Sequence, residues 1–435
     1  MRGNPRQVAL RVLRRVDEGA YVNLALEGEI ARAQLAPNDR GLATALVYGV
    51  LKGQARLDHA LARLAPRGID KLDAQTKDLL RLGAFQLLEL RTPAHAAVDE
   101  TVDSVRKLRG AKLAGFANAL LRKLATQGAP PPPDAPLALR LSVTTGAPLW
   151  VVEAALQRLG PVEAEGLLSA EGKPAPMWLR VNPLRVSDAA ALAASLGATL
   201  STLCPRALLL PAAAGVFDSP DYVEGRLTAQ DLGAQLVGTL LDPRPGETIL
   251  DACSGVGGKS TQLAERMGNE GRVDALDLSA RKLDIGADHA RRLGLSIVSS
   301  VVADLTKTAP GLYDRVLLDA PCSGLGVARR HPEVRLRRGV EQVAELAVLQ
   351  ARLLEAAAAR VRPGGVLVYA VCTYTDEEGP AQLQRFLAAH ADFTRDASAP
   401  IPASLRGRGA EGELRTWPHH DDADAFFAAR LRRAE

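Results

Sequence analysis

From about residue 226 onwards, short apolar runs alternate with longer amphipathic helical runs. The apolar runs include "ETILDAC", "RVDALDLS", "YDRVLLDAP" and "GGVLVYAVC", and helical patterns such as "KSTQLAERM" and "ARKLDIGADHARRLG" lie between them. Neighbouring parallel strands need a long crossover connection, and a helix supplies it. The pattern therefore predicts a doubly wound, Rossmann-like α/β domain over residues 226–435. Ligands of such sheets bind at the carboxyl ends of the strands.

The chain ahead of this domain predicts two further parts, so we expect a multidomain protein. Residues 1–128 carry only helical periodicity, as in "DRGLATALVYGVL" and "AGFANALLRKLA", which predicts an all-α domain. The proline run "APPPPDAP" cannot continue a helix, so we expect a linker over residues 129–139. Residues 140–225 mix helical and strand-like runs and predict a small α+β module.

Composition narrows the class of protein. The 435 residues are 47% hydrophobic, and no apolar run approaches the ~20 residues that cross a membrane. The four cysteines form no CxxC pair, which favours a reducing cytoplasm and predicts no metal site. A net charge of +4 is compatible with an RNA partner without establishing one.

A glycine-rich loop, "DACSGVGGKST", follows the first strand of the α/β domain. Its end resembles a phosphate-binding P-loop, but that motif needs a glycine where Cys253 stands. The alternative is a nucleoside cofactor. Asp277 lies about twenty residues further on, where a carboxylate accepts hydrogen bonds from ribose. Strand-end acids recur at Asp251, Asp277, Asp304 and Asp319, although a helix N-cap is an equally good explanation of Asp251.

Cys322 and Cys372 both follow predicted strands and are flanked by loop residues, whereas Cys204 is explained as a small buried side chain. One chemistry uses two such thiols and an acid together. The C5 carbon of a pyrimidine accepts a methyl group only after a thiolate adds to C6, with a carboxyl group assisting near N3 and a base later removing the C5 proton. Cys322, Cys372 and Asp319 supply these groups.

At these residues the sequence resembles the RNA cytosine-5 methyltransferases. "DAPCSG" and "VCTYTDEE" are similar to that family's paired cysteine motifs, and "DACSGVGGKST" is similar to its glycine loop. Gly255 and Val256 replace the usual Ala-Pro of that loop, and Asp424-Ala425-Phe426-Phe427 replaces the usual Asp-Gly-Phe-Phe near the C-terminus.

The N-terminal helices resemble the NusB-type RNA-binding fold. Together with the small ferredoxin-like module and the class I methyltransferase domain, they are similar to the ribosomal RNA small-subunit methyltransferase B (Sun/Fmu) family. The resemblance implies S-adenosylmethionine as cofactor and 5-methylcytosine in 16S rRNA as product, formed through a covalent adduct between cysteine and C6. Methylation of tRNA or another RNA remains an alternative, and a non-catalytic RNA-binding protein is an alternative of a different class.

The resemblance also assigns roles to individual residues. Cys372 is implied as the nucleophile, Cys322 as the group that assists release, and Asp319 as the acid near the base. The residues implied around the cofactor are Cys253, Ser254, Gly255, Val256, Gly257, Gly258, Lys259, Asp277, Asp304 and Asp319.

A burst of arginines follows Cys322, and we expect it to clamp RNA phosphates beside the reacting base. A solvated start of a helix is the other interpretation. The five residues are Arg329, Arg330, Arg335, Arg337 and Arg338. We further expect a cytoplasmic monomer that acts on naked small-subunit rRNA, with no membrane partner.

Overall fold

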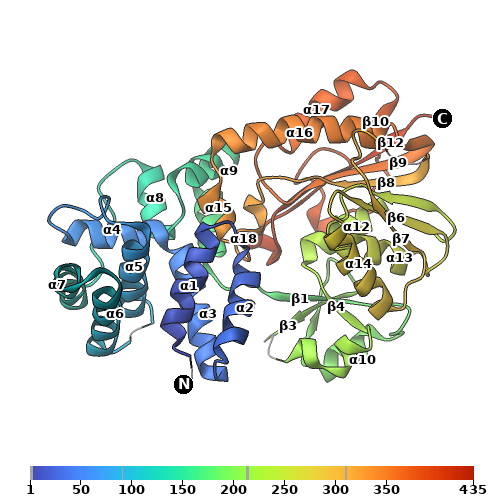
Figure 1. The fold of residues 1–435 in the computed structure, drawn as a ribbon. Helices are drawn as coiled ribbons and strands as arrows, with labels where there is room; N and C mark the ends of the chain where they lie inside the picture. Colours follow the sequence, from blue (N-terminus) through green and yellow to red (C-terminus); the bar gives the residue numbers. More distant parts are fainter. Residues whose placement is uncertain (1–2, 91, 212–214, 309–310) are drawn as a thin grey trace. The chain divides into compact units, whose positions relative to one another are not determined.

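The computed structural model describes residues 3–90, 92–211, 215–308 and 311–435, which form two compact units (Figure 1). The first unit comprises Met1–Pro174 and Ala328–Arg337, and the second comprises Ala175–Val327 and Arg338–Glu435. The chain therefore leaves the second unit directly after Val327, contributes ten residues to the first unit, and returns.

The first unit is entirely helical in its described residues. Its helices are α1 (Pro5–Asp17), α2 (Val22–Ala33), α3 (Pro37–Lys52), α4 (Gln54–Leu64), α5 (Ala74–Leu88), α6 (Ala94–Arg109), α7 (Ala111–Gln127), α8 (Leu137–Thr145), α9 (Leu149–Gly172) and α15 (Glu333–Arg337). Asn4 starts α1 by accepting hydrogen bonds from the backbone N–H groups of Arg6 and Gln7. The apolar stripes of α1 to α7 share one core, as amphipathic helices require.

The first compact unit extends beyond the proline run. Residues 129–136 are non-helical, as the proline run predicts, but α8 and α9 follow them and still belong to the first unit. The Lys52 ammonium, at the end of α3, donates a 2.6 Å hydrogen bond to the Lys173 carbonyl just beyond α9. The proline run is thus a connection within the first compact unit. Local composition reveals a helix break but not the packing beyond it.

The segment Ala328–Arg337 is built into the interior of the first unit. Glu333 and Arg335 of α15 are both 0% exposed. The Glu333 carboxylate accepts from the Val22 N–H at 3.1 Å, and the Arg335 guanidinium donates to the Lys52 carbonyl at 2.7 Å. The Arg335 carbonyl in turn accepts from the Trp150 indole N–H at 3.2 Å. These contacts offset part of the cost of burying the two charged side chains.

The second unit begins with a small antiparallel sheet in the order β2-β3-β1-β4. Its strands are β1 (Met177–Val181), β2 (Thr199–Leu200), β3 (Ala207–Leu210) and β4 (Leu227–Ala229), accompanied by α10 (Ala189–Ser195), the 3₁₀ turn η1 (Val216–Asp218) and α11 (Pro220–Val223). Leu179, Val181, Leu208 and Leu227 are fully buried in its own core. This sheet is the expected α+β module.

The larger sheet has eight strands in the order β10-β12-β9-β8-β5-β6-β7, with β11 paired to β12. Strands β5 to β9 are parallel, and β12 is antiparallel to β9. The strands are β5 (Thr248–Asp251), β6 (Arg272–Asp277), β7 (Val298–Val302), β8 (Tyr313–Asp319), β9 (Val361–Val371), β10 (Phe393–Arg395), β11 (Glu413–Thr416) and β12 (Phe426–Arg433).

Helices cover both faces of this sheet (Figure 1). They are α12 (Leu232–Leu241), α13 (Gly258–Arg266) and α14 (Ala280–Leu293) on one face, and α16 (Val340–Ala358) and α17 (Pro380–Ala389) on the other. The short helix α18 (Pro418–Asp421) and the 3₁₀ turns η2 (Leu325–Val327) and η3 (Ala403–Leu405) lie in the connecting segments. Leu317 packs in the core beneath α12, α13 and α14, whereas Val316 and Leu318 pack in the core beneath α16 and α17. This alternation follows from the two-residue period of a strand and confirms the predicted doubly wound domain.

Among the helices described, none has the length and apolar character that a membrane crossing demands.

A buried ion pair joins the small sheet to α13 of the large domain. Arg180 of β1 is 3% exposed, and its guanidinium donates to both carboxylate oxygens of Glu265 at 2.8 and 2.9 Å. The same guanidinium donates to the Gly258 carbonyl at 2.9 Å. Gly258 is the first residue of α13, so Arg180 holds the end of the glycine loop from behind.

We expect Arg180→Met to lower the stability of the second unit by about 3–5 kcal/mol, because it leaves the Glu265 carboxylate buried without its counter-charge. Urea unfolding followed by circular dichroism measures this. Arg291→Met is the matched control, since Arg291 lies in an exposed pair with Asp288 worth about 0–1 kcal/mol. Replacing Glu265 by Leu in the Arg180→Met background should recover part of the loss. Equal stability of the two single variants would contradict this account.

Candidate active site

The glycine loop runs from β5 to α13 at the carboxyl edge of the large sheet. Gly255 and Gly257 have φ of 56° and 78°, which side chains with a Cβ rarely adopt. A Cβ on Gly257 would also lie 2.9 Å from the Gly286 Cα of α14. Glycine at 257 therefore lets α13 and α14 approach closely, and the loop backbone is left open towards the sheet edge. Cys253 lies inside this loop, half-buried against the core of the sheet, and burial raises the pKa of its thiol.

Asp277 ends β6 and is held against the glycine loop. Its Oδ2 accepts from the Gly255 N–H at 3.1 Å and its Oδ1 accepts from the Ser279 N–H at 2.8 Å. Asp304 follows β7 at the same edge, where its Oδ1 accepts from the N–H and the hydroxyl of Thr306. Both acids thus lie where the strand-end pattern predicts. Asp251 instead is buried beneath the loop and accepts from the Ser260 hydroxyl at 2.6 Å, so it is not the cap of α13.

The groups around this edge fit a nucleoside cofactor such as S-adenosylmethionine. Leu278 follows the last residue of β6 and is 72% exposed, and Val302 is the last residue of β7 and is 61% exposed. Both offer apolar faces to a flat base. The Ser254 hydroxyl is buried without a hydrogen-bond partner among the described residues. Asp277 adds a carboxylate at the position that recognises ribose hydroxyls. An apolar cradle with a few aimed polar groups is typical of cofactor sites.

The two cysteines meet at the adjacent strand ends. Strands β8 and β9 are parallel neighbours, with Asp319 opposite Ala370. Cys372 follows β9 directly, and Cys322 lies three residues beyond Asp319, so the register brings both to one place. Their sulfur atoms are 3.4 Å apart, and both side chains are half-buried. The structure therefore brings together the three residues that the sequence predicts as catalytic.

Lys259 lies in this cluster, although its sequence motif places it with the cofactor loop. Its Nζ is 2.6 Å from the Asp319 Oδ2 and 5.2 Å from the centre of the Phe426 ring. Burial lowers the pKa of the ammonium, but Asp319 more than offsets this, and the pKa is raised overall. Lys259 therefore stays protonated and anchors Asp319. The two residues are 60 positions apart in the chain, so no local motif reveals the pair.

The environment of Cys322 keeps it protonated. The hydrogen bond with Cys372 and burial raise the pKa of the Cys322 thiol well above its usual range, and the charges of Cys372, Glu378 and Asp319 act in the same direction. Glu378 is a fully buried acid that the sequence motifs did not single out. The only available signal was its place in the acidic run that follows Cys372.

The arginine burst after Cys322 is distributed differently from the expectation. Arg335 is fully buried and bonded as described above, and Arg329 is 7% exposed and donates to the Pro174 carbonyl at 3.0 Å. Arg337 donates to backbone carbonyls of the first unit, namely those of Val16, Gly19 and Ala20.

These three guanidinium groups bind protein carbonyls, because several fixed donors suit buried backbone oxygens as well as phosphates. Burial and these contacts make Arg329 and Arg335 unavailable for the phosphate clamp expected from the sequence. Arg337 is exposed despite its contacts with carbonyls, Arg330 and Arg338 are half-exposed, and these three remain as candidates for contact with RNA.

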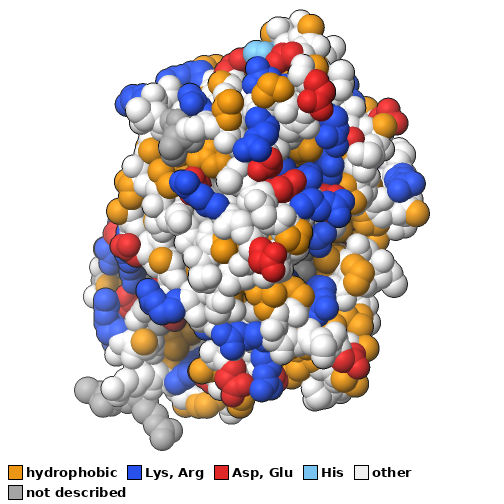
Figure 2. Space-filling view, turned by 90° about the vertical axis from the view of Figure 1, so that its right-hand side faces the viewer, with side chains coloured by type: hydrophobic (Ala, Val, Ile, Leu, Met, Phe, Trp, Pro, Cys, Tyr) orange, Lys and Arg blue, Asp and Glu red, His pale blue; other side chains and the backbone are white. Residues whose placement is uncertain are grey.

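The face drawn in Figure 2 gives no further indication of where RNA binds. On the face drawn in Figure 2, lysine and arginine side chains are interspersed with acidic and apolar ones and form no single basic field. A mixed surface of this kind provides only weak non-specific attraction for a polyanion.

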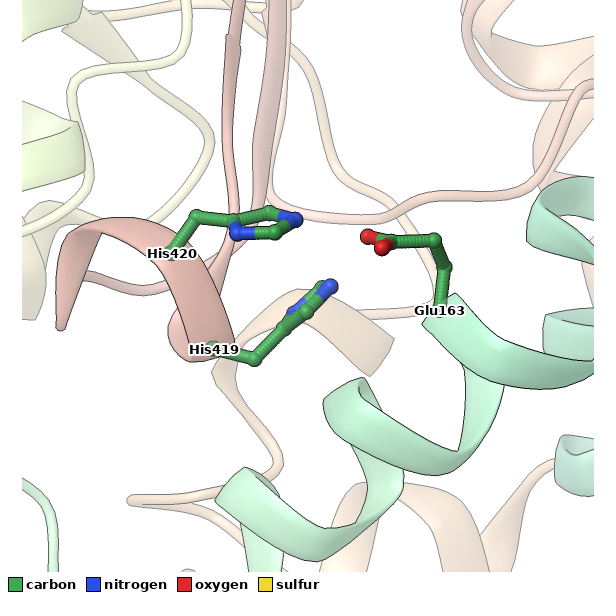
Figure 3. A group of neighbouring side chains, drawn as sticks. All are labelled: Glu163, His419 and His420. Carbon is green, nitrogen blue, oxygen red and sulfur yellow. The ribbon is translucent and has the colours of Figure 1, made fainter.

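His419 and His420 are adjacent on α18, with ring centres 4.2 Å apart (Figure 3). Glu163, drawn in the same figure, belongs to α9 of the first unit. Two imidazoles are fewer protein ligands than a metal site normally uses, so we assign no metal to this pair.

Comparisons with known proteins agree with the helical domain, the small α+β module and the methyltransferase domain that the sequence predicts. The model of the NusB family matches residues 3–126, a model described as the ferredoxin-like domain of RsmF/B-like methyltransferases matches residues 147–216, and the model "16S rRNA methyltransferase RsmB/F" matches residues 238–432. The solved structure of a methyltransferase homologue from Pyrococcus horikoshii is 25% identical, with a TM-score of 0.59, over 69% of this chain and 99% of its own.

Two curated relatives extend the similarity over the full length. Ribosomal RNA small subunit methyltransferase B of Thermus thermophilus is 38% identical and aligns over 99% of this chain and 98% of its own. The protein of the same name from Xylella fastidiosa is 37% identical over 98% and 97%. The resemblance predicted from the sequence motifs is thereby confirmed, and with the site geometry it supports one conclusion: the chain belongs to the family of ribosomal RNA small subunit methyltransferase B.

Proposed function

We propose that this protein methylates the C5 carbon of a cytosine in small-subunit rRNA, with S-adenosylmethionine as methyl donor. The observation that carries the proposal is the pair of cysteine sulfurs 3.4 Å apart, beside the salt bridge of Asp319 and Lys259. Two thiols within reach of one carbon pair, with an acid held by a fixed cation, match the needs of covalent C5 methylation.

The cysteines act in sequence. The Cys372 thiolate forms a bond to C6, and the electron pair of the C5–C6 double bond becomes available at C5, while Asp319 in its protonated form donates a hydrogen bond to N3. Bound at the glycine loop, S-adenosylmethionine supplies the methyl group. Cys322 releases its own proton to solvent and, as a thiolate, removes the C5 proton; the C5–C6 double bond re-forms, and the Cys372 sulfur leaves C6 as a thiolate.

The environment of Cys322 suits a group that acts late in the cycle. The hydrogen bond with Cys372 and burial raise the pKa of the Cys322 thiol, and the charges of Cys372, Glu378 and Asp319 act in the same direction. Formation of the bond between the Cys372 sulfur and C6 removes the first of these causes, which favours loss of the Cys322 proton to solvent at that stage.

A base must leave its stack before its C5 and C6 atoms reach these thiols. Unpaired RNA that ribosomal proteins do not yet cover makes this step easiest, so we propose naked small-subunit rRNA as the substrate. Bisulfite sequencing of total RNA from a deletion strain tests the assignment. One cytosine of the small-subunit rRNA should lose its methyl group and regain it with the wild-type gene but not with Cys372→Ala. Loss of the mark from tRNA alone would favour the alternative substrate.

The two cysteine variants should behave unequally. Cys372→Ala removes the nucleophile, so no methyl group should transfer. Cys322→Ala leaves attack and transfer possible but removes the base for elimination, so enzyme and methylated RNA should remain joined. Denaturing gels after incubation with RNA and S-adenosylmethionine detect the joined species as a slow band. If the band appeared with Cys372→Ala and not with Cys322→Ala, the two roles would be reversed. If both variants were modestly destabilised and neither gave a band, both cysteines would be packing residues.

Asp277→Ala should weaken cofactor binding by about 10- to 100-fold, because a hydrogen bond to a charged acceptor contributes about 1.5–3 kcal/mol. Isothermal titration with S-adenosylhomocysteine measures the dissociation constant. Asp288→Ala on the exposed side of α14 is the matched control and should bind like the wild type. Unchanged binding by Asp277→Ala would remove this acid from the cofactor site.

Arg330→Ala and Arg338→Ala should each weaken RNA binding and flatten its salt dependence. The slope of log K against log salt should change by about 0.7–0.9 for each phosphate that the variant no longer neutralises. Fluorescence anisotropy with an rRNA fragment at several salt concentrations provides the slopes. Arg291→Ala, which removes an exposed arginine of α14, should leave the slope unchanged. Wild-type slopes for both variants would exclude the two arginines from the RNA contact.

A further inference from the structure

A buried carboxylate lies behind the two cysteines and is assigned no bond-making or proton-transfer step in the chemistry described so far. Glu378 follows Cys372 by six residues and is 0% exposed. Its Oε1 accepts from the Ser323 N–H at 2.7 Å and from the Gln350 side-chain amide at 3.0 Å. Its Oε2 accepts from the Ser323 hydroxyl at 2.5 Å and from the Thr375 hydroxyl at 2.9 Å. Both oxygens are therefore fully engaged by donors.

These donors come from the loops that carry the two thiols. Ser323 is the residue after Cys322, and Thr375 lies three residues after Cys372. The amide of Gln350, on α16, also donates to the Pro321 carbonyl at 2.9 Å. The Glu378 backbone carbonyl accepts from the Tyr369 hydroxyl of β9 at 2.5 Å. One carboxylate thus connects the end of β8, the end of β9 and the helix that covers them.

Two further contacts tie the loops to each other at the level of the cysteines. The hydroxyls of Ser323 and Thr373 are 2.9 Å apart, and the Gly326 N–H donates to the Cys372 carbonyl at 3.0 Å. A Cβ on Gly326 would lie 2.0 Å from the Ala425 carbonyl oxygen, so only glycine allows this approach. The separation of the two sulfurs is therefore fixed by their supporting loops.

The burial of the Glu378 carboxylate is explained if this side chain holds other groups in a geometry that catalysis needs. Burying a carboxylate is costly, and the cost is offset only when its hydrogen bonds are complete. The groups that Glu378 holds must place two thiols around one pyrimidine edge, and a displacement of about 1 Å at a reacting group can reduce a rate by about 100-fold. A side chain that spans both loops meets that demand.

We propose that Glu378 is a positioning residue that sets the separation of Cys322 and Cys372 for the methyl transfer cycle. The inference rests on the proposed cytosine-5 methylation. Glu378 does not contact the reacting base, and it acts through Ser323 and Thr375.

Substitutions that separate length from charge test this role. Glu378→Asp keeps the charge but is one methylene shorter, so it cannot reach both Ser323 and Thr375. Glu378→Gln keeps the length, and its amide NH₂ can donate to the two hydroxyls, which also accept hydrogen bonds. We expect kcat to fall about 10- to 100-fold in Glu378→Asp, with KM for RNA changed little, and Glu378→Gln to recover most of the rate. Glu377→Asp, the same change at the exposed neighbouring position, should act like the wild type.

A second measurement reports the geometry without any methylation. Diamide oxidises two neighbouring thiols to a disulfide and is itself reduced to the hydrazine. Sulfurs 3.4 Å apart should join rapidly in the wild type, and peptide mapping identifies the Cys322–Cys372 product. Closure should be slower in Glu378→Asp and close to the wild-type rate in Glu378→Gln. Ser323→Ala, which removes only the hydroxyl contacts, should be intermediate in both assays and serves if Glu378→Asp does not fold.

The outcomes separate the inference from the function on which it rests. The positioning role would be overturned if Glu378→Asp formed the disulfide at the wild-type rate, even if methylation were lost. If Glu378→Asp does not fold, the same result in Ser323→Ala would overturn it. Equal losses in the Asp and Gln variants would overturn it as well, since length would then not be decisive. A different result would refute the proposed function alone. In that case the rate of disulfide formation would depend on Glu378, but the wild-type protein would methylate no RNA.

Discussion

The parallel pairing of β8 with β9 is the contact on which the site depends. These strands are separated by α15 and α16 in the chain, yet their register places Asp319 opposite Ala370, so their carboxyl ends finish together. Each strand leads directly into a short loop with a thiol. A slip of one residue in this pairing would turn the neighbouring side chains to the opposite face of the sheet. Apolar side chains on both faces of the sheet enforce this register. The same register therefore brings the reacting groups at the two strand ends together.

Buried charges around this edge play different parts. Lys259 and Asp319 form a pair with a solvent-facing side, whereas Arg180 with Glu265 and Glu378 with its four donors are closed networks. Closed networks of this kind hold one geometry, because any partial opening leaves a charge without partners in a medium of low polarity. The reacting groups therefore lie in front of rigid polar supports.

The sequence was informative where local patterns decide the structure. Alternating periodicity predicted the parallel sheet, and strand ends followed by Asp277, Asp319, Cys322 and Cys372 predicted the edge at which the site forms. It was uninformative where the deciding partner is remote. Arg335 resembles a surface cation in its local context, but its partners are Lys52 and Glu171, and Glu378 resembles one of several acids in a turn. Burial of a charged residue depends on such long-range partners, which no local window contains.

The excursion of Ala328–Arg337 into the helical unit has a consequence for how this protein can be inherited and engineered. A domain attached by one linker can be exchanged by a single recombination event. Here the helical unit is completed by ten residues that the chain supplies from between β8 and α16. A donor or recipient in such an exchange would need matching junctions at Pro174 and on both sides of that insertion. The helical unit and the loop that carries Cys322 are therefore bound to change together.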